Sequence, residues 1–423
     1  MKYIKKYYHW IIAVVLFLVT AIRGGAANNI SGLHLIPVTE AMDISRAQYS
    51  MAGSVSNMAA MLTVLFSGGL VLRYGHRFLL TVFLMVGAVA YAAMTFAEGY
   101  ILWFAGYVLL GVANGICGEA GSTRLVSVWF HKHRGAVLGV VSSATGLGGS
   151  IMCIVQTAVM EAGTYRTSYL LVAILFAIVA VLTLIFVRSH PAKMGLLPYG
   201  DGEKITYKKR EHEDHWHGFA MHQIYRRPTF YMMLIGTFLS CMLPYLAFFV
   251  VVPHLQDRGM SAMQASSIQS VLMLGLAGFK ILAGYLCDRI GARKVALLCM
   301  SFDAVALMLL ALTTGFAMSL AAVVIFSMGL PIVTIIIPLL ASTLFGYQAQ
   351  TEYNGIFIAM VSAASMVAGP LSNAFYDRLG TYSPVFLVAA ALTVGLMGMY
   401  LLMYRLADKD RKNFEAEEAE IQR

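Results

Sequence analysis

The feature that most constrains the fold of this chain is a series of apolar runs long enough to cross a lipid bilayer. About 20 apolar residues in a helix span roughly 30 Å of hydrocarbon. Twelve such runs occur in the 423 residues, near 10–36, 49–72, 78–97, 101–127, 136–160, 168–187, 230–252, 264–287, 295–314, 317–344, 355–376 and 384–404. Hydrophobic residues make up 59% of the chain and charged residues 12%, as in integral membrane proteins. We therefore predict an all-α membrane protein with twelve transmembrane helices.

The 30 lysines and arginines are distributed unevenly between the two sides of such a membrane protein. With the N-terminus in the cytoplasm, 23 of them fall in cytoplasmic segments, and only Arg46, Arg166, Arg258 and Arg378 fall outside. This asymmetry follows the positive-inside rule and predicts that both termini are cytoplasmic. The net charge of +9 is thus explained by membrane topology, and we expect no nucleic-acid partner. The short basic loops favour a bacterial inner membrane.

The start of the chain and its cysteines indicate neither a cleaved signal peptide nor a metal centre. Lys2, Lys5 and Lys6 precede an apolar run, but that run continues to Pro37 and eleven more follow, so we expect the first helix to be retained. All five cysteines lie in predicted helices, which suggests neither a disulfide framework nor a zinc site. Four histidines at 212, 215, 217 and 222 match no standard metal-ligand spacing. We expect no metal and no cofactor.

The two halves of the sequence resemble each other. Segment 68–77 matches segment 284–293 at an offset of 216 residues, and a Gly-Thr-Tyr triplet at 163–165 recurs at 380–382. Parallel repeats of this kind are found in secondary transporters. We predict two parallel six-helix repeats, at 1–188 and 230–406, joined by a cytoplasmic linker at 189–229. The charged tail, 407–423, is expected to be a solvated cytoplasmic helix that joins no core.

A short charged turn interrupts the apolar sequence near residue 288. Its residues match the pattern G-x-x-x-D-R-x-G-x-R-K at Gly284, Asp288, Arg289, Gly291, Arg293 and Lys294. This segment resembles the conserved loop of the major facilitator superfamily. The resemblance implies a gating loop after the eighth transmembrane helix. In the matching loop of the first half, Leu72 replaces the aspartate of the family, so a charge latch is expected only in the second half.

Two further motifs resemble one branch of that superfamily. The segment from Trp129 to Gly135, with Gly139, is similar to the W-F-x-x-x-R-G-x-x-x-G element of the monocarboxylate and oxalate:formate branch. The pairs Phe345-Gly346 and Gly369-Pro370, followed by 376–382, resemble elements around the eleventh helix of that branch. The fifth helix lacks the Gly-Pro pairing of drug:proton antiporters, which makes drug efflux a less favoured function.

Two cations are predicted near the middle of the bilayer. Lys280 lies eight residues before Asp288, about 12 Å along the helix axis. Arg23 lies thirteen residues after Trp10, about 20 Å into the first helix. A cation at such a depth is a functional hypothesis by default. In the resembled families an arginine at the place of Lys280 binds the substrate carboxylate. We predict that Arg23 and Lys280 bind an anion between the two halves. A snorkelling Lys280 and an Arg23–Glu119 ion pair are the structural alternatives.

Other polar residues in the predicted helices complete the candidate site. Glu119, between cationic neighbours, is the candidate for proton coupling, with a fixed partnership to Arg124 or Arg23 as the alternative. Arg124 and Asn28 are further candidates for substrate binding, and so is Tyr245, which follows the helix-bending Pro244. Asp303, in the ninth helix, is expected to have a structural hydrogen-bonding role.

These observations predict a monomeric secondary transporter, not an enzyme, that moves a small organic anion such as a monocarboxylate. Proton symport or exchange against a counter-anion would drive it. No G-x-x-x-x-G-K-[ST] loop for ATP is present in the sequence, nor a His-Glu-x-x-His or Gly-x-Ser-x-Gly catalytic motif. Efflux of amphipathic compounds or larger organic anions is the alternative function.

Overall fold

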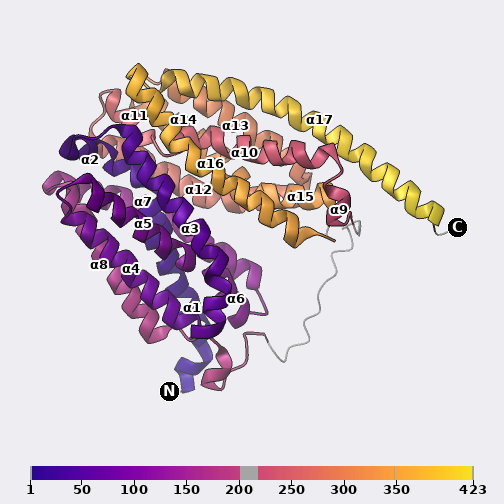
Figure 1. The fold of residues 1–423 in the computed structure, drawn as a ribbon, viewed down its shortest axis with the longest axis horizontal. Coiled ribbons are helices and arrows are strands. Elements are labelled where there is room, and N and C mark those ends of the chain that lie inside the picture. The colour runs from indigo at the N-terminus through magenta and orange to yellow at the C-terminus, as the bar shows by residue number, and fades with distance from the viewer. Residues whose placement is uncertain (1, 201–217, 347, 422–423) are drawn as a thin grey trace. The chain divides into compact units, whose positions relative to one another are not determined.

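The computed structural model describes residues 2–200, 218–346 and 348–421, and every regular element in these residues is a helix. The first part of the chain contains α1 (Lys2–Thr20), η1 (Ala21–Asn29), η2 (Ser31–His34), α2 (Leu35–Met42), α3 (Arg46–Tyr74), α4 (His76–Thr95), α5 (Tyr100–Cys117), α6 (Glu119–Trp129), α7 (Arg134–Ala162), α8 (Tyr165–Phe186) and η3 (Pro191–Met194). The second part contains α9 (Met221–Ile224), α10 (Pro228–Phe248), α11 (Val251–Asp257), α12 (Ala262–Ile290), α13 (Ala292–Leu312), α14 (Phe316–Gly329), η4 (Ile332–Ile336), α15 (Ile337–Phe345), α16 (Gln350–Leu379) and α17 (Ser383–Ile421). Figure 1 shows their course.

The number of membrane-spanning helices agrees with the sequence prediction. Eleven helical segments among the described residues are long and apolar enough to cross a bilayer. The remaining predicted run, 49–72, lies within the 29-residue helix α3, whose sequence carries more polar side chains. The chain is therefore an all-helical membrane protein.

The helices form two compact units. The first contains Met1–Lys208, Phe249–Gly278 and Gly369–Thr381. The second contains Lys209–Phe248, Phe279–Ala368 and Tyr382–Arg423. Helices α12 and α16 each contribute residues to both units. The predicted halves at 1–188 and 230–406 stay a prediction.

Large buried aromatic side chains and small residues pack the first unit. Helix α4 lies along α8 and α5, and α3 lies along α5 (Figure 1). Trp103, Tyr169 and Phe176 are almost completely buried between them. A Cβ on Gly87 would lie 2.8 Å from the ring of Phe176, so only glycine allows α4 to approach α8 this closely.

The Trp129-Phe130 motif anchors the segment that follows α8. Trp129 Nε1 donates a hydrogen bond to the carbonyl oxygen of Arg188, at 2.9 Å. The amides of His131 and Lys132 both donate to the carbonyl oxygen of Tyr199. The amide of Tyr199 in turn donates to the carbonyl oxygen of Trp129. Both motif side chains are fully buried. In this chain the motif therefore holds the beginning of the linker against the first unit.

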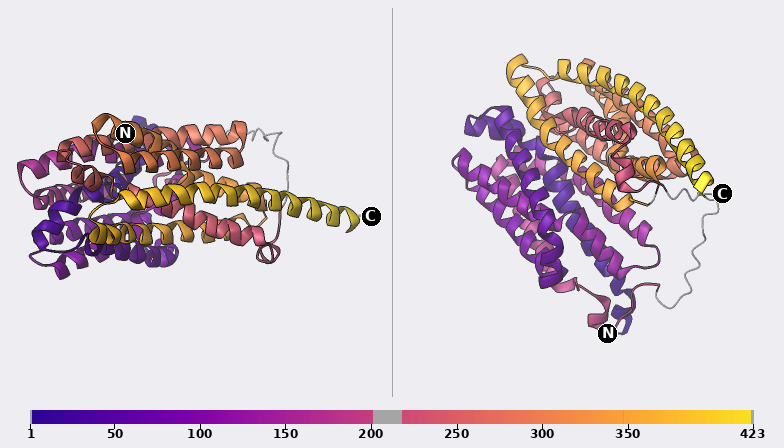
Figure 2. Two further views of the ribbon diagram at one scale, coloured as in Figure 1. Left: turned by 90° about the horizontal axis from the view of Figure 1, so that it is seen from above. Right: turned by 45° about the vertical axis from the view of Figure 1, so that its right-hand side comes forward.

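In the second unit, α13 packs on α14 and α17, and α10 packs on α17. Helix α17 runs along this unit and continues past its other helices (Figure 2). The tail does join other structure: Asp408 pairs with Arg293 at 2.6 Å, Asp410 pairs with Arg227 at 3.2 Å, and Phe414 packs on Phe219. The sequence prediction of a tail without a core was incorrect because these partners lie far away in the sequence.

The internal repeat recurs in the local structure. Ser45 and Gln48 form a reciprocal cap at the start of α3, and Ser261 and Gln264 form the same cap before α12, 216 residues later. The turns that follow these two helices each contain a glycine with positive φ, 80° at Gly75 and 87° at Gly291. Only glycine adopts this conformation without strain. The predicted turn is thus confirmed as a tight one: α12 continues to Ile290 and α13 begins at Ala292, so only Gly291 of the segment 284–294 lies between the two helices.

Candidate functional site

The first spanning helix is interrupted where Arg23 was predicted to lie. After α1 the backbone forms a nine-residue π-helix, η1, then a 3₁₀ turn, η2, and the short helix α2. Carbonyl groups of η1 receive side-chain donors from other helices. Gln156 Nε2 donates to the carbonyl oxygen of Ala26 at 2.8 Å, and the Tyr91 hydroxyl donates to that of Ala27 at 3.4 Å. Helices α7 and α4 therefore stabilise the irregular segment.

Glycines allow η1 and α7 to touch through their backbones. A Cβ on Gly25 would lie 2.5 Å from the Gly149 amide nitrogen, and one on Gly148 would lie 2.6 Å from the Ala21 carbonyl oxygen. Both distances are far below van der Waals contact. Gly148 and Gly149 thus allow close packing against η1, whereas Gly146 faces Met273 and Ala277 of α12.

Arg23 and Asn28 both lie in the π-helix η1, five residues apart. Residues five positions apart are hydrogen-bonded neighbours in a π-helix, whereas in an α-helix they point in different directions. Arg23 is half-buried and Asn28 is exposed. Arg23 lies within electrostatic range of Cys117, at the end of α5. The helix is interrupted there at Gly118, which separates α5 from α6.

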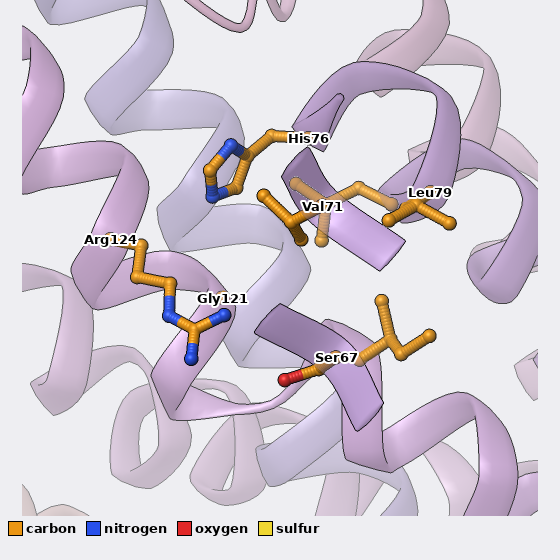
Figure 3. Close-up of a pocket in the computed structure, with 8 residues that line it drawn as sticks. Ser67, Val71, His76, Leu79, Gly121 and Arg124 are labelled. Atoms are coloured by element: carbon orange, nitrogen blue, oxygen red, sulfur yellow. The ribbon is translucent and has the colours of Figure 1, made fainter. Parts of the chain in front are cut away.

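Arg124 belongs to a different place in the first unit. It is exposed and lines a small pocket with Ser67, Val71, His76, Leu79, Leu80, Ile116 and Gly121. In Figure 3 the guanidinium of Arg124, the imidazole of His76 and the hydroxyl of Ser67 face the same space. Arg124 and His190 are both within electrostatic range of His76. The lining residue Leu80 accepts a hydrogen bond from Cys117 Sγ through its carbonyl oxygen, which links the pocket to the surroundings of Arg23.

Glu119 is the first residue of α6, and its side chain lies outside the part of the structure that is described. Its role in proton coupling, and the alternative of an ion pair with Arg23 or Arg124, both stay predictions. Three of the linker histidines, at 212, 215 and 217, also lie outside the described residues. Among the residues that are described, no group of three or more His, Cys, Asp or Glu side chains could hold a metal ion.

The second unit carries Lys280, Tyr245 and the gating loop. Lys280 is half-buried and lies ten residues before the end of the uninterrupted helix α12, about 15 Å along its axis. Tyr245 is half-buried in α10, one residue after Pro244, and packs on Phe248. In the loop Asp288, Arg289 and Gly291 are exposed, while Arg293 pairs with Asp408 of α17. Arg23 and Lys280 belong to different units, and their joint binding of an anion stays a prediction.

Sequence reasoning missed a buried polar network behind η1. His34 Nε2 lies 2.9 Å from Ser168 Oγ, and Ser168 Oγ lies 3.4 Å from Gln156 Oε1. Because Gln156 donates to Ala26, its oxygen accepts from Ser168, and the Ser168 oxygen then accepts from His34. The network fixes the orientation of the Gln156 amide. The sequence signal was a glutamine in an apolar helix, but its partners lie on other helices.

A second missed feature joins the start of α3 to α11 and α16 within the first unit. The Arg46 guanidinium donates to both carboxylate oxygens of Asp257, at 2.6 and 2.8 Å, and lies 3.7 Å from the ring centre of Tyr376. The amides of Arg46 and Ala47 donate to the carboxylate of Asp377. These contacts hold the N-terminus of α3 against α11 and the C-terminal part of α16.

Comparisons with known proteins agree on one family. The family model described as Major Facilitator Superfamily matches residues 16–253 and, a second time, residues 233–422. The chain is 25% identical over 346 residues to the hexuronate transporter of Bacillus subtilis, with 76% of this chain and 77% of that protein covered. It is 22% identical over 384 residues to the putative glycerol-3-phosphate transporter 1 of Arabidopsis thaliana, with 81% and 73% covered.

Solved structures show the same fold. The nucleoside transporter NupG superposes with a TM-score of 0.74 at 12% identity, covering 94% of this chain and 99% of that one. A bacterial homolog of the human lysosomal transporter Spinster superposes with a TM-score of 0.73 at 15% identity, covering 97% and 99%.

Proposed function

Because the chain belongs to the major facilitator superfamily and is thus a secondary transporter and not an enzyme, we propose that it carries a small organic anion whose carboxylate or phosphate group binds at Arg23. The monocarboxylate-like acids of the branch that the sequence resembles are the first members of this class. The driving force would be proton symport or exchange against another anion. Both termini are proposed to lie in the cytoplasm of a bacterial cell.

The π-helix around Arg23 is the observation that carries this proposal. Arg23 and Asn28 both lie in this irregular segment of a membrane helix, five residues apart. Interrupted helices mark the binding sites of many secondary transporters. A guanidinium donates two parallel hydrogen bonds to a carboxylate or phosphate, and an amide adds a neutral donor. This arrangement suits an anion with further polar groups.

Two similar proteins support the charge of the substrate. One is named for hexuronate and the other for glycerol 3-phosphate. Both compounds are organic anions, one with a carboxylate and one with a phosphate. Lys280 and Tyr245 are proposed to complete the site from the second unit, and Glu119 to bind the coupled proton. A lysine at 280 lacks the fork of an arginine, which agrees with an anion other than a simple monocarboxylate.

The test is uptake of radiolabelled anions into proteoliposomes with an imposed pH gradient, using formate, acetate, lactate, pyruvate, oxalate, glucuronate and glycerol 3-phosphate. Arg23→Gln and Lys280→Gln should each weaken binding by about 2 kcal/mol or more, which corresponds to a roughly 30-fold rise in KM. Arg405→Gln is the matched control, because Arg405 is an exposed cation on α17.

Normal uptake by the Arg23→Gln variant would contradict the assignment of the site. If none of these anions moves while amphipathic compounds are exported, the anion proposal is wrong and efflux is the function.

A further inference from the structure

An acidic side chain, Asp303, is buried in a membrane-spanning helix far along the chain from Arg23. Asp303 lies in the middle of α13 and is only 1% exposed. Its Oδ1 atom has no hydrogen-bond partner among the described residues. The carboxylate lies against Gly329, the last residue of α14, where an added Cβ would overlap Oδ1. The structural hydrogen bond expected of Asp303 from the sequence is therefore not made by Oδ1.

Apart from the C-terminal part of α17, the elements that pack most closely on α13 carry few ionisable side chains in the part of the chain that the structure describes. They are α10, α14, η4, α15 and α17. Helices α14 and α15 and the segment η4 contain no ionisable side chain. Helix α10 contributes Cys241, and α13 itself contributes Cys299, both within electrostatic range of Asp303. On α17, Tyr400 lies near Cys241 and hydrogen-bonds Ser240 at 3.2 Å.

The cations of α13 itself, Arg293 and Lys294, lie at its start, nine or more residues before Asp303. Arg293 lies ten residues before Asp303 on α13, about 15 Å along the axis, and pairs with Asp408. A carboxylate in an apolar interior without a partner costs several kcal/mol, and a bound proton removes that cost. The surroundings of Asp303 therefore hold the neutral acid.

The fold does not require an acid at this place. The repeat offset of 216 residues places Gly87 at the equivalent position of α4, where the close approach of Phe176 leaves no room for a side chain. The two repeats share turns and caps but differ here. An acid confined to one repeat is expected to serve the transport cycle.

Asp303 also lies beside an irregular stretch of the neighbouring membrane-spanning segment, Phe316–Phe345. After Gly329, Leu330 and Pro331 keep right-handed helical φ and ψ angles, and the π-helix η4 follows. Proline and π-helical turns are the usual places where a membrane helix bends. A bend at 330–336 would move Gly329 away from the carboxylate and admit water.

We propose that Asp303 is a proton-binding site whose occupancy is coupled to the bend between α14 and α15. The proton is held while Gly329 covers the carboxylate, and it passes to water when the helix bends. The part of this inference that concerns transport rests on the function proposed above. The proton site itself does not.

Infrared spectroscopy of the reconstituted protein tests the proton site without a substrate. Protein labelled with ¹³C at the aspartate side-chain carboxyl should show, at neutral pH, a carboxylic-acid carbonyl band that shifts with the label. Asp303→Asn should remove this band, and Ser327→Ala, another buried polar side chain on α14, should retain it. If the wild-type protein shows no isotope-sensitive acid band, Asp303 is ionised and the proposal is wrong. The wild-type spectrum gives this answer even if the variant fails to fold.

Transport measurements then separate coupling from packing. Asn has the shape of the neutral acid but cannot release a proton. Asp303→Asn should therefore lose uphill accumulation driven by a pH gradient and should keep counterflow exchange of an anion identified in the uptake panel. Unchanged accumulation, or equal loss of accumulation and counterflow in a folded variant, would overturn the coupling role. If the wild-type protein moves no anion, the proposed function has failed, and the infrared result still decides the proton site.

Discussion

Single glycines decide how closely η1 can approach α7. Gly148 faces the backbone of Ala21, whereas Gly139, on the same helix, has nothing within 4 Å of an added Cβ. We expect Gly148→Ala to destabilise the protein by about 1–3 kcal/mol, because the backbone cannot move aside as a side chain can. Gly139→Ala should be neutral or stabilising, since alanine favours helix. Thermal unfolding of both variants in detergent measures the difference. Equal melting temperatures would show that the two helices are not in backbone contact.

At the scale of elements, the start of α3 is held by residues from two distant helices. Asp377 caps its first amides, and Asp257 binds the Arg46 guanidinium with two oxygens. The side chains of this ion pair are only 14% and 23% exposed, so solvent screens it incompletely. We expect a double-mutant cycle of Arg46→Ala and Asp257→Ala to give a coupling free energy of about 1–2 kcal/mol.

The cycle is measured by thermal unfolding, in which each single variant should melt lower and the double variant little lower than either. Additive effects would mean that the pair contributes nothing. Asp377→Ala should lower the free energy of unfolding by a further amount of about 0.5–2 kcal/mol, as removal of an N-cap does. Asp377→Asn should restore most of this loss, because an amide oxygen also accepts from the helix amides.

At the scale of the whole molecule, the C-terminal part of α17 belongs to the second unit. Asp408, Asp410 and Phe414 contact Arg293, Arg227 and Phe219. A chain ending after Leu406 loses two ion pairs and an aromatic pair, which together contribute on the order of 2 kcal/mol. A chain ending after Phe414 keeps all three. We expect only the shorter chain to melt lower and to give less monodisperse protein. Identical behaviour of the two chains would show that these contacts add no stability.

The sequence by itself determined the features that follow from short-range rules. Apolar runs of about 20 residues are dictated by the thickness of the bilayer, and the turns at Gly75 and Gly291 by the conformation that only glycine adopts easily. The 216-residue repeat was visible for the same reason, since each half meets the same local requirements.

The tertiary structure alone decided which groups meet. The irregular backbone at Arg23 depends on Gln156, 130 residues away from its acceptor. Arg46 finds its two acids 211 and 331 residues further along the chain. The apolar surroundings of Asp303 come from helices that are distant in sequence, and α10, α14 and α15 contain no cationic side chain. Hydrogen bonds and charges act over a few ångströms of space, and a sequence in which most positions are apolar gives little indication of which polar residues will share that space.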